Sequence, residues 1–196
     1  MFDALSKSAI CSSRIVITRS PGRTRVRLER AAGNVRLATV SSRLYRCARW
    51  TLLIIRDAFY GVRRFNDFQA HLDIPKAVLS ARLSALVDNG LLRRRPDPDH
   101  AGRHLYELTD TGRDLWPALY ALQVWGGRHR HPNSRVFKHT ACNTTLDDSG
   151  YCATCEMTPA PEDILTKPRR GRDTLRDDAV ARALRTPRRV LEPVAT

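Results

Sequence analysis

Three short helical patterns in a row, followed by a basic strand-like segment, constrain this chain more than any other feature. Apolar residues of the segment 49–90 recur at helical spacing in three groups, separated by turn residues. The first group, 52–59, is apolar on most sides, as in a helix at the centre of a core. The second is 65–72. The third runs from Pro75 to Asn89, because proline favours the first helical position and Gly90 favours the turn that ends a helix.

The third predicted helix has two different faces when its residues are projected at about 100° per residue. Leucine and valine side chains fall on one face. The other face carries small or hydroxyl side chains, with one lysine at the boundary: Lys76, Ala77, Ser80, Ala81 and Ser84. The major groove admits a helix only when its leading side chains fit, so such a face is typical of a helix that reads DNA. We interpret it as a recognition helix.

A β-hairpin is predicted directly after this helix. Its strands are expected at 91–95 and 103–108, and the loop between them, 96–102, is rich in turn residues. Basic residues crowd the hairpin, Arg94 and His104 among them, and two more lie just before the second helix. Those expected to contact DNA are Arg63, Arg64, Arg93, Arg95, His100 and Arg103. Three helices followed by such a hairpin, or wing, predict a winged helix-turn-helix domain, which is mainly α with a small β-hairpin.

The charge of the chain favours a nucleic-acid partner. Its 196 residues include 34 Lys and Arg but only 20 Asp and Glu, which gives a formal net charge of +14. Such an excess steers a protein toward nucleic acid or an anionic membrane. A membrane partner is not expected, because no apolar run approaches the roughly 20 residues that span a bilayer and the start lacks the features of a secretory signal. We therefore expect a cytoplasmic, nucleoid-associated protein.

A fourth amphipathic helix is predicted from Thr111 to Gly126, with Thr109 and Asp110 as its N-terminal cap. Its apolar stripe consists of Leu115, Trp116, Leu119, Leu122 and Trp125. A winged helix already has its core, so this stripe needs a partner surface. Homodimerisation is the simplest choice, since two-fold proteins match two-fold operators. The alternative is that the helix packs on its own domain.

A cluster of cysteines follows later in the chain. His139 and Cys142 form an H-x2-C pair, and after a gap of nine residues Cys152 and Cys155 form a C-x2-C pair. Each pair has the spacing of a zinc knuckle, in which a tight turn brings two side chains to one tetrahedral ion. Three interpretations stay open: a zinc site, a metal-free hairpin, or a reversible disulfide between Cys152 and Cys155. No cofactor other than zinc is expected.

Composition divides the chain into four parts. Residues 1–43 form a basic arm that is expected to be poorly ordered, with a short strand over 14–18 as an alternative. Residues 44–128 form the winged-helix domain with its dimerisation helix, and 129–160 form the cysteine-bearing hairpin. The tail, 161–196, is basic and rich in proline, and we expect it to be disordered.

Three segments resemble the HxlR type of bacterial winged-helix transcription regulators, which are relatives of the MarR type. They are RWTLLIIRDAFYGVRRFNDF, PKAVLSARLSALVDNGLLRRR and YELTDTGRDLWPALYALQVWG, and they occur in the family's order within residues 47–126. The resemblance implies a dimeric DNA-binding regulator that docks the third helix in the major groove, often under control of a small-molecule inducer. One departure concerns the family's cysteine, about a dozen residues before the tryptophan that Trp50 matches, since Cys47 lies only three residues ahead of Trp50.

Together these features predict a sequence-specific transcriptional regulator, acting as a homodimeric repressor on an inverted-repeat operator. The alternative is a zinc-ribbon interaction module with non-specific nucleic-acid binding, in which the helices only present the cysteine cluster. An enzyme is not expected, because the sequence contains no glycine-rich phosphate loop, nucleophile elbow or histidine–acid pair at catalytic spacing.

Overall fold

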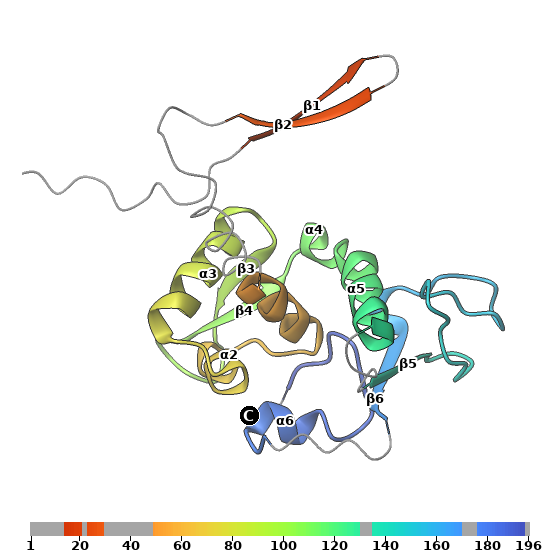
Figure 1. The fold of residues 1–196 in the computed structure, drawn as a ribbon. Helices are drawn as coiled ribbons and strands as arrows, with labels where there is room; N and C mark the ends of the chain where they lie inside the picture. Colours follow the sequence, from red (N-terminus) through yellow and green to blue (C-terminus); the bar gives the residue numbers. More distant parts are fainter. Residues whose placement is uncertain (1–13, 21–22, 30–48, 130–134, 170–175, 195–196) are drawn as a thin grey trace, which may run out of the picture. The chain divides into compact units, whose positions relative to one another are not determined.

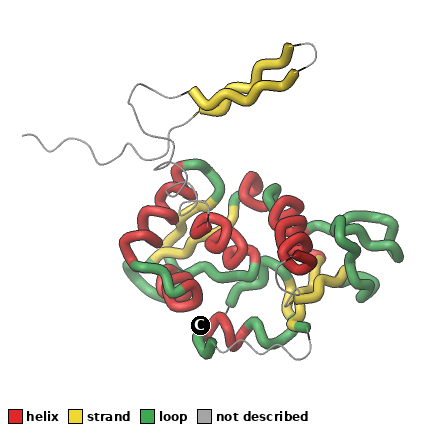
Figure 2. Tube along the Cα trace, in the orientation of Figure 1, coloured by secondary structure: helices red, strands yellow, loops and turns green. Residues whose placement is uncertain are grey.

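The computed structural model describes residues 14–20, 23–29, 49–129, 135–169 and 176–194. They belong to two units, Met1–Leu44 and Tyr45–Thr196, and each unit is described by itself. Figure 1 follows the chain by colour, and Figure 2 shows more helix than strand in the second unit. Among the described residues, no helix is both long enough and apolar enough to cross a membrane.

The first unit contains an antiparallel hairpin of β1, Arg14–Ser20, and β2, Arg23–Glu29. Its register pairs Ile15 with Leu28. The alternative of a strand over 14–18 is confirmed, and the expectation of a poorly ordered arm is wrong for these two strands. That expectation was based on the high content of arginine and serine, whereas the β-branched residues of this segment favour strands.

Three helices open the second unit, as the sequence predicted. Residues 49–59 form the first, and they are followed by α2, Phe65–Leu72, and α3, Lys76–Asp88. Pro75 is the N-cap residue of α3, and the Asn89 side-chain amide donates a hydrogen bond of 2.6 Å to a carbonyl in the last turn. The predicted limits of α3 are therefore one residue too long at each end.

The wing is confirmed as an antiparallel pair, β3, Leu92–Pro96, and β4, His104–Leu108. The residues before α2 extend this pairing, because the Tyr106 N–H donates to the Arg63 carbonyl at 2.8 Å. This hydrogen bond ties the wing to the start of α2, so the wing strands and the helix-turn-helix form one body.

The predicted helix from 111 to 126 is two helices in the structure, α4, Asp110–Arg113, and α5, Trp116–His129. As predicted, the Thr109 side chain caps the beginning, by accepting a hydrogen bond from the backbone in the first turn of α4. The interruption lies just before Pro117, which has no backbone N–H to continue the helical hydrogen bonds. The prediction of a continuous helix was wrong for this reason.

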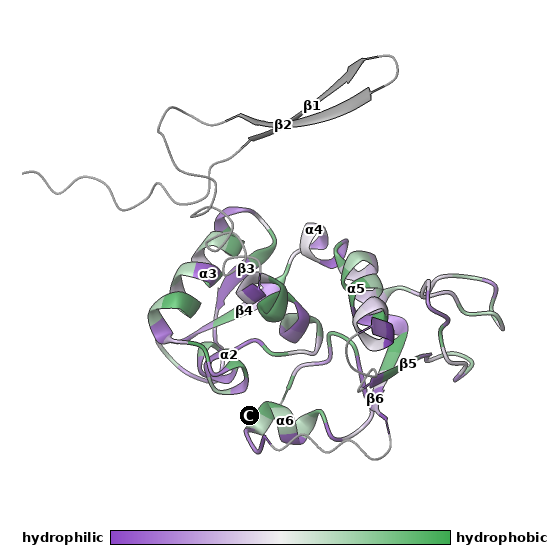
Figure 3. Ribbon diagram, in the orientation of Figure 1, coloured by the Kyte–Doolittle hydropathy of each residue, from purple (hydrophilic) through white to green (hydrophobic). Residues whose placement is uncertain are grey.

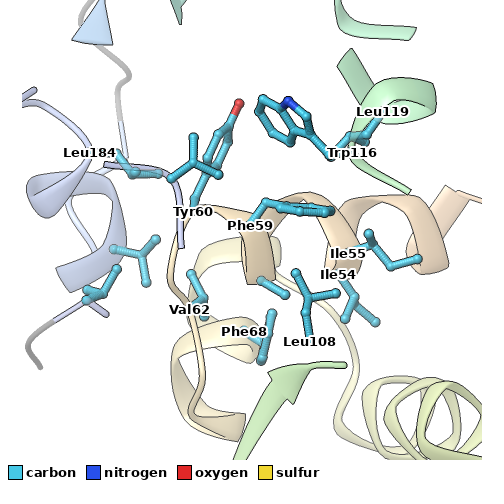
Figure 4. Close-up of a cluster of buried hydrophobic side chains, with 14 of the residues drawn as sticks. Ile54, Ile55, Phe59, Tyr60, Val62, Phe68, Leu108, Trp116, Leu119 and Leu184 are labelled. Atoms are coloured by element: carbon cyan, nitrogen blue, oxygen red, sulfur yellow. The ribbon is translucent and has the colours of Figure 1, made fainter. Parts of the chain in front are cut away.

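The hydrophobic core is centred on the helix over 49–59, and Figure 4 shows its side chains meeting those of α2, β4 and α5. Phe59 and Phe68 are fully buried, and so are the α3 residues Leu79 and Leu83, at 0% and 1% exposure. The ring of Trp116 packs against Phe59, with ring centroids 5.1 Å apart. Helix α5 is thus part of the core of its own chain.

A three-stranded antiparallel sheet follows α5. Its order is β5, Arg135–His139, then β6, Ile164–Pro168, then β7, Arg188–Arg189. A 3-10 turn, η1, Pro161–Asp163, precedes β6, and helix α6, Ala179–Ala183, precedes β7. The expectation of a disordered tail from residue 161 is therefore wrong for residues 161–169 and 176–194.

The end of the chain is tied to the helix over 49–59 and to the turn that follows it. The Leu191 N–H donates to the Phe59 carbonyl at 2.6 Å, and the Val194 N–H donates to the Gly61 carbonyl at 3.0 Å. Val180 and Val190 are buried, at 1% and 2% exposure, which adds apolar packing to these hydrogen bonds. Only a few apolar residues hold this segment in place. Its mainly basic composition therefore predicted disorder.

Candidate nucleic-acid interface

Helix α3 presents the predicted reading face to solvent. The five residues of this face, Lys76, Ala77, Ser80, Ala81 and Ser84, are all exposed. The opposite side of α3 is anchored by Leu79, Leu83 and Leu86, which are at most 3% exposed. The structure therefore brings the predicted residues together on one surface, which we call the α3 face.

The turn between α2 and α3 sets the direction of α3. Asp73 has a left-handed backbone, with φ of 51°, and Ile74 is buried at 2% exposure. The N–H of Leu79 donates to the Pro75 carbonyl at 3.0 Å, which closes the first turn of the helix. A buried isoleucine between a reversal and a helix start leaves the α3 face little freedom to rotate.

A buried carboxylate organises the loop of the wing. The Asp97 side chain is fully buried and accepts hydrogen bonds from Arg64 Nε and from the Asp99 N–H, both at 3.0 Å. His100 Nδ1 lies 3.4 Å from the same carboxylate. Burial acts to raise the pKa of Asp97, but the hydrogen bonds from Asp99 and Arg64 outweigh it and lower that pKa. The loop is therefore built around a charged aspartate.

Arg64 takes part in this arrangement. Its guanidinium contacts Asp97 and lies 3.5 Å from the Asp99 carboxylate, and the side chain is only 21% exposed. Arg64 therefore holds the wing, and its contact with DNA stays a prediction.

Replacing Asp97 with asparagine is expected to loosen the wing and weaken DNA binding several-fold without unfolding the domain. The amide keeps the shape but loses the charge that attracts Arg64. Because the folded pKa of Asp97 is lowered, its stabilisation is present above the ordinary carboxyl pKa and is lost as pH falls through the folded value. Hydrogen exchange of residues 98–103, measured from neutral to acidic pH, checks the loosening of the wing and its pH dependence. Titration of labelled operator DNA checks the loss of affinity.

Asp99→Asn is the matched control, because the Asp99 carboxylate is 72% exposed and 3.5 Å from Arg64. Exchange rates that change equally in the two variants would contradict a special role for Asp97.

Three of the predicted basic residues gather around one glutamate. Glu107 lies 3.0 Å from Arg93, 3.3 Å from Arg63 and 3.4 Å from Arg95. Burial acts to raise the pKa of Glu107, but the hydrogen bond from Arg93 and the charges of the three arginines lower it. One negative charge faces three positive ones, so the cluster keeps a net positive charge. Figure 3 shows much of β3 as hydrophilic.

Residues His100 and Arg103 lie at the tip of the wing. Both line a groove of about 520 Å³ between the wing and the start of α2, together with Arg64 and His104. Arg94 belongs to the same basic hairpin. It is exposed, and its guanidinium lies 2.9 Å from the His104 ring. The alternation of strand side chains puts Arg94 on the face opposite Arg93 and Arg95.

The predicted dimer stripe divides into a buried part and an exposed part. Trp116 and Leu119 are only 4% and 6% exposed, because Phe59 and Phe137 of the same chain cover this side of α5. These two residues are thus covered by their own chain, and Leu115 also packs against the core. The exposed part is Leu122 and Trp125, at 51% and 52% exposure.

The four residues of the predicted metal site lie together, at the end of β5 and in the loops after it. The ligand atoms of His139, Cys142, Cys152 and Cys155 are all within 4.8 Å of one another. The two pairs, separated by nine residues in the sequence, thus face each other across one small space.

Comparisons with known proteins agree with this architecture. The family model described as HxlR-like helix-turn-helix matches residues 47–134. An HTH-type transcriptional regulator of Mycobacterium tuberculosis is 39% identical over 127 residues, which are 63% of this chain and 80% of the relative. The HTH-type transcriptional regulator YvaP of Bacillus subtilis is 36% identical over 78 residues, which are 39% of this chain and 72% of the relative.

A solved structure, the reduced form of the transcriptional regulator YodB from B. subtilis, is 25% identical. It matches 50% of this chain and 98% of its own length, with a TM-score of 0.39. Because this score is low, the assignment of a family rests on the sequence matches. The family model and the M. tuberculosis relative show that the chain belongs to the HxlR-like helix-turn-helix family of transcriptional regulators.

Proposed function

We propose that this chain is a sequence-specific, cytoplasmic DNA-binding regulator that reads its operator with the α3 face. One observation carries the proposal: every residue of that face is exposed, while Leu79, Leu83 and Leu86 on the same helix are buried. Small and hydroxyl side chains let a helix approach base edges closely, and Lys76 at the helix start can contact a phosphate.

The wing supplies the phosphate contacts in this proposal. Arg93 and Arg95 have side chains that are 53% and 60% exposed, and Arg103 at the tip is exposed as well. Guanidinium groups bind phosphate oxygens through paired hydrogen bonds, and each neutralised phosphate releases counterions. We therefore expect affinity that falls steeply as salt concentration rises.

A footprint on operator DNA tests the proposal. A dimer is expected to protect two half-sites about one helical turn apart, with affinity that decreases steeply with salt. Uniform protection along any DNA, with no preferred sequence, would contradict it. That result would favour the alternative of a zinc-ribbon module with non-specific binding, which membership of a helix-turn-helix family does not favour.

We also propose that the chain acts as a homodimeric repressor, and that the exposed part of the α5 stripe contributes to the dimer. Exchange of Leu122 for aspartate together with Trp125 for serine is expected to shift the protein from dimer to monomer, because the two side chains are half exposed and apolar. Sedimentation at several protein concentrations measures the shift. The control is Tyr151→Ser, which changes another exposed aromatic residue. An unchanged dimer in the double variant would remove α5 from the interface.

A further inference from the structure

The His139, Cys142, Cys152 and Cys155 cluster already has the dimensions of a tetrahedral site. Cys142 Sγ lies 3.3 Å from Cys152 Sγ and 3.6 Å from His139 Nδ1. In a zinc site with Zn–S bonds of about 2.3 Å, neighbouring ligand atoms are separated by roughly 3.8 Å. The four ligand atoms, all within 4.8 Å of one another, therefore need only small shifts to share one ion.

Two turns with the same backbone pattern deliver these ligands. The His139 N–H donates to the Thr144 carbonyl at 2.9 Å, and the Cys152 N–H donates to the Met157 carbonyl at 2.8 Å. In each turn, the first ligand thus donates to the carbonyl five residues later. Two unrelated loops have no reason to repeat this pattern unless both serve the same geometry.

The repetition extends to the residue after each second ligand. Asn143 follows Cys142 with φ of 58°, and Glu156 follows Cys155 with φ of 52°. This left-handed backbone is uncommon for residues other than glycine, and Glu156 lacks even the modest tolerance of asparagine for it. In both turns the reversal points the second ligand back toward the first.

The loops contain too little apolar surface to hold this arrangement by packing alone. From residue 140 to residue 160 the chain forms turns and isolated bridges but no helix or strand. Leu146, Cys152 and Pro159 are the buried apolar residues within that segment. Figure 1 shows the two loops extending away from β5 at the right of the second unit. Long loops of this kind are usually disordered or held by some additional crosslink.

We infer that His139, Cys142, Cys152 and Cys155 bind one Zn²⁺ ion in a closed, structural site. Three thiolates and one imidazole form a donor set that favours zinc over harder ions such as Mg²⁺ or Ca²⁺. Four protein ligands leave no open position for substrate or water, so the ion has a structural and not a catalytic role.

The ion holds these loops against α5 and the core. His139 ends β5, and two residues earlier Phe137 packs on Trp116 and Tyr120, with ring centroids 5.7 and 5.3 Å apart. The Tyr120 hydroxyl donates to the Asp147 carbonyl at 2.7 Å, within the loop between the two ligand pairs. Removal of zinc therefore releases the contacts on one side of α5, while the packing of α3 is left in place.

Metal analysis of the full chain, purified under reducing conditions, tests the site. We expect one zinc per chain, and replacement by Co²⁺ is expected to give the strong visible absorption of tetrahedral thiolate coordination. Cys155→Ser is the informative variant, because Cys155 is the exposed cysteine of the cluster and its exchange does not open the core. It is expected to lose most of the bound zinc. Cys11→Ser and Cys47→Ser are controls that keep one zinc per chain.

A second measurement distinguishes a structural ion from adventitious zinc. Treatment of the wild-type chain with a chelator is expected to lower its melting temperature and to speed hydrogen exchange in residues 140–160, with exchange in α3 unchanged. Wild-type protein without zinc would overturn the inference. So would zinc that remains at one per chain in Cys155→Ser, or a Cys142–Cys152 disulfide in protein kept under reducing conditions.

Discussion

Exchange of Ser80 for glutamate is expected to abolish operator binding and leave the domain folded. Ser80 is exposed at the middle of the α3 face, so the larger side chain meets solvent in the free protein. In the complex, its carboxylate faces phosphates and base acceptors without a partner, and like charges in an interface cost several kcal/mol. The expected loss of affinity is at least about a hundredfold. Fluorescence anisotropy at constant salt measures it, and thermal unfolding monitors the fold.

Ala118→Glu is the matched control for this variant. Ala118 is exposed on α5, so the substitution adds the same negative charge to a helix outside the α3 face. It is expected to change affinity only slightly, through the net charge of the chain. Equal losses in the two variants would mean that charge alone governs binding. Full affinity of Ser80→Glu would mean that another surface reads the DNA.

Exchange of Gly61 for alanine is expected to destabilise the second unit strongly. Gly61 has φ of +87°, and a Cβ at this position would lie 1.7 Å from the Glu192 carbonyl oxygen. The left-handed conformation costs about 1–2 kcal/mol for an alanine, and displacement of packed backbone adds about 1–3 kcal/mol. The hydrogen bond from the Val194 N–H to the Gly61 carbonyl is expected to break as well. Urea unfolding gives the difference in free energy.

Gly102→Ala separates conformational strain from the steric clash. Gly102 has a similar φ of +77°, but a Cβ at this position would have no atom within 4 Å. The free energy of unfolding of this variant is expected to fall only by the cost of the left-handed conformation, about 1–2 kcal/mol. Equal losses in the two variants would contradict close packing between the end of the chain and the turn at Gly61.

The parts of the fold that were predictable from sequence are those with a local signal. The three helices and the wing follow from apolar periodicity and from turn residues such as Pro75 and Gly90, which act within a few residues. The folded structure of residues 176–194 depends on contacts with residues that are far away in the sequence. Leu191 pairs with Phe59 across more than a hundred residues, and no local pattern encodes that contact.

The candidate site was predictable to a similar extent. Projection of α3 identified its exposed face, because the face is a property of one helix. The roles of the arginines were not predictable, since Arg64 holds Asp97, and Glu107 holds three others, through contacts between separate segments. Contacts between separate segments also explain why the burial of part of the α5 stripe was not predictable. Phe137, from the strand after α5, covers Trp116, so the partner of α5 is largely its own chain.

Selection of genomic fragments bound by the wild-type chain, at near-physiological salt, is the most direct test of DNA reading by the α3 face. The expected result is an enriched inverted repeat, with half-site centres about 10 base pairs apart, that disappears when the selection is repeated with Ser80→Glu. Bound fragments without a shared sequence, or the same repeat recovered with Ser80→Glu, would contradict it.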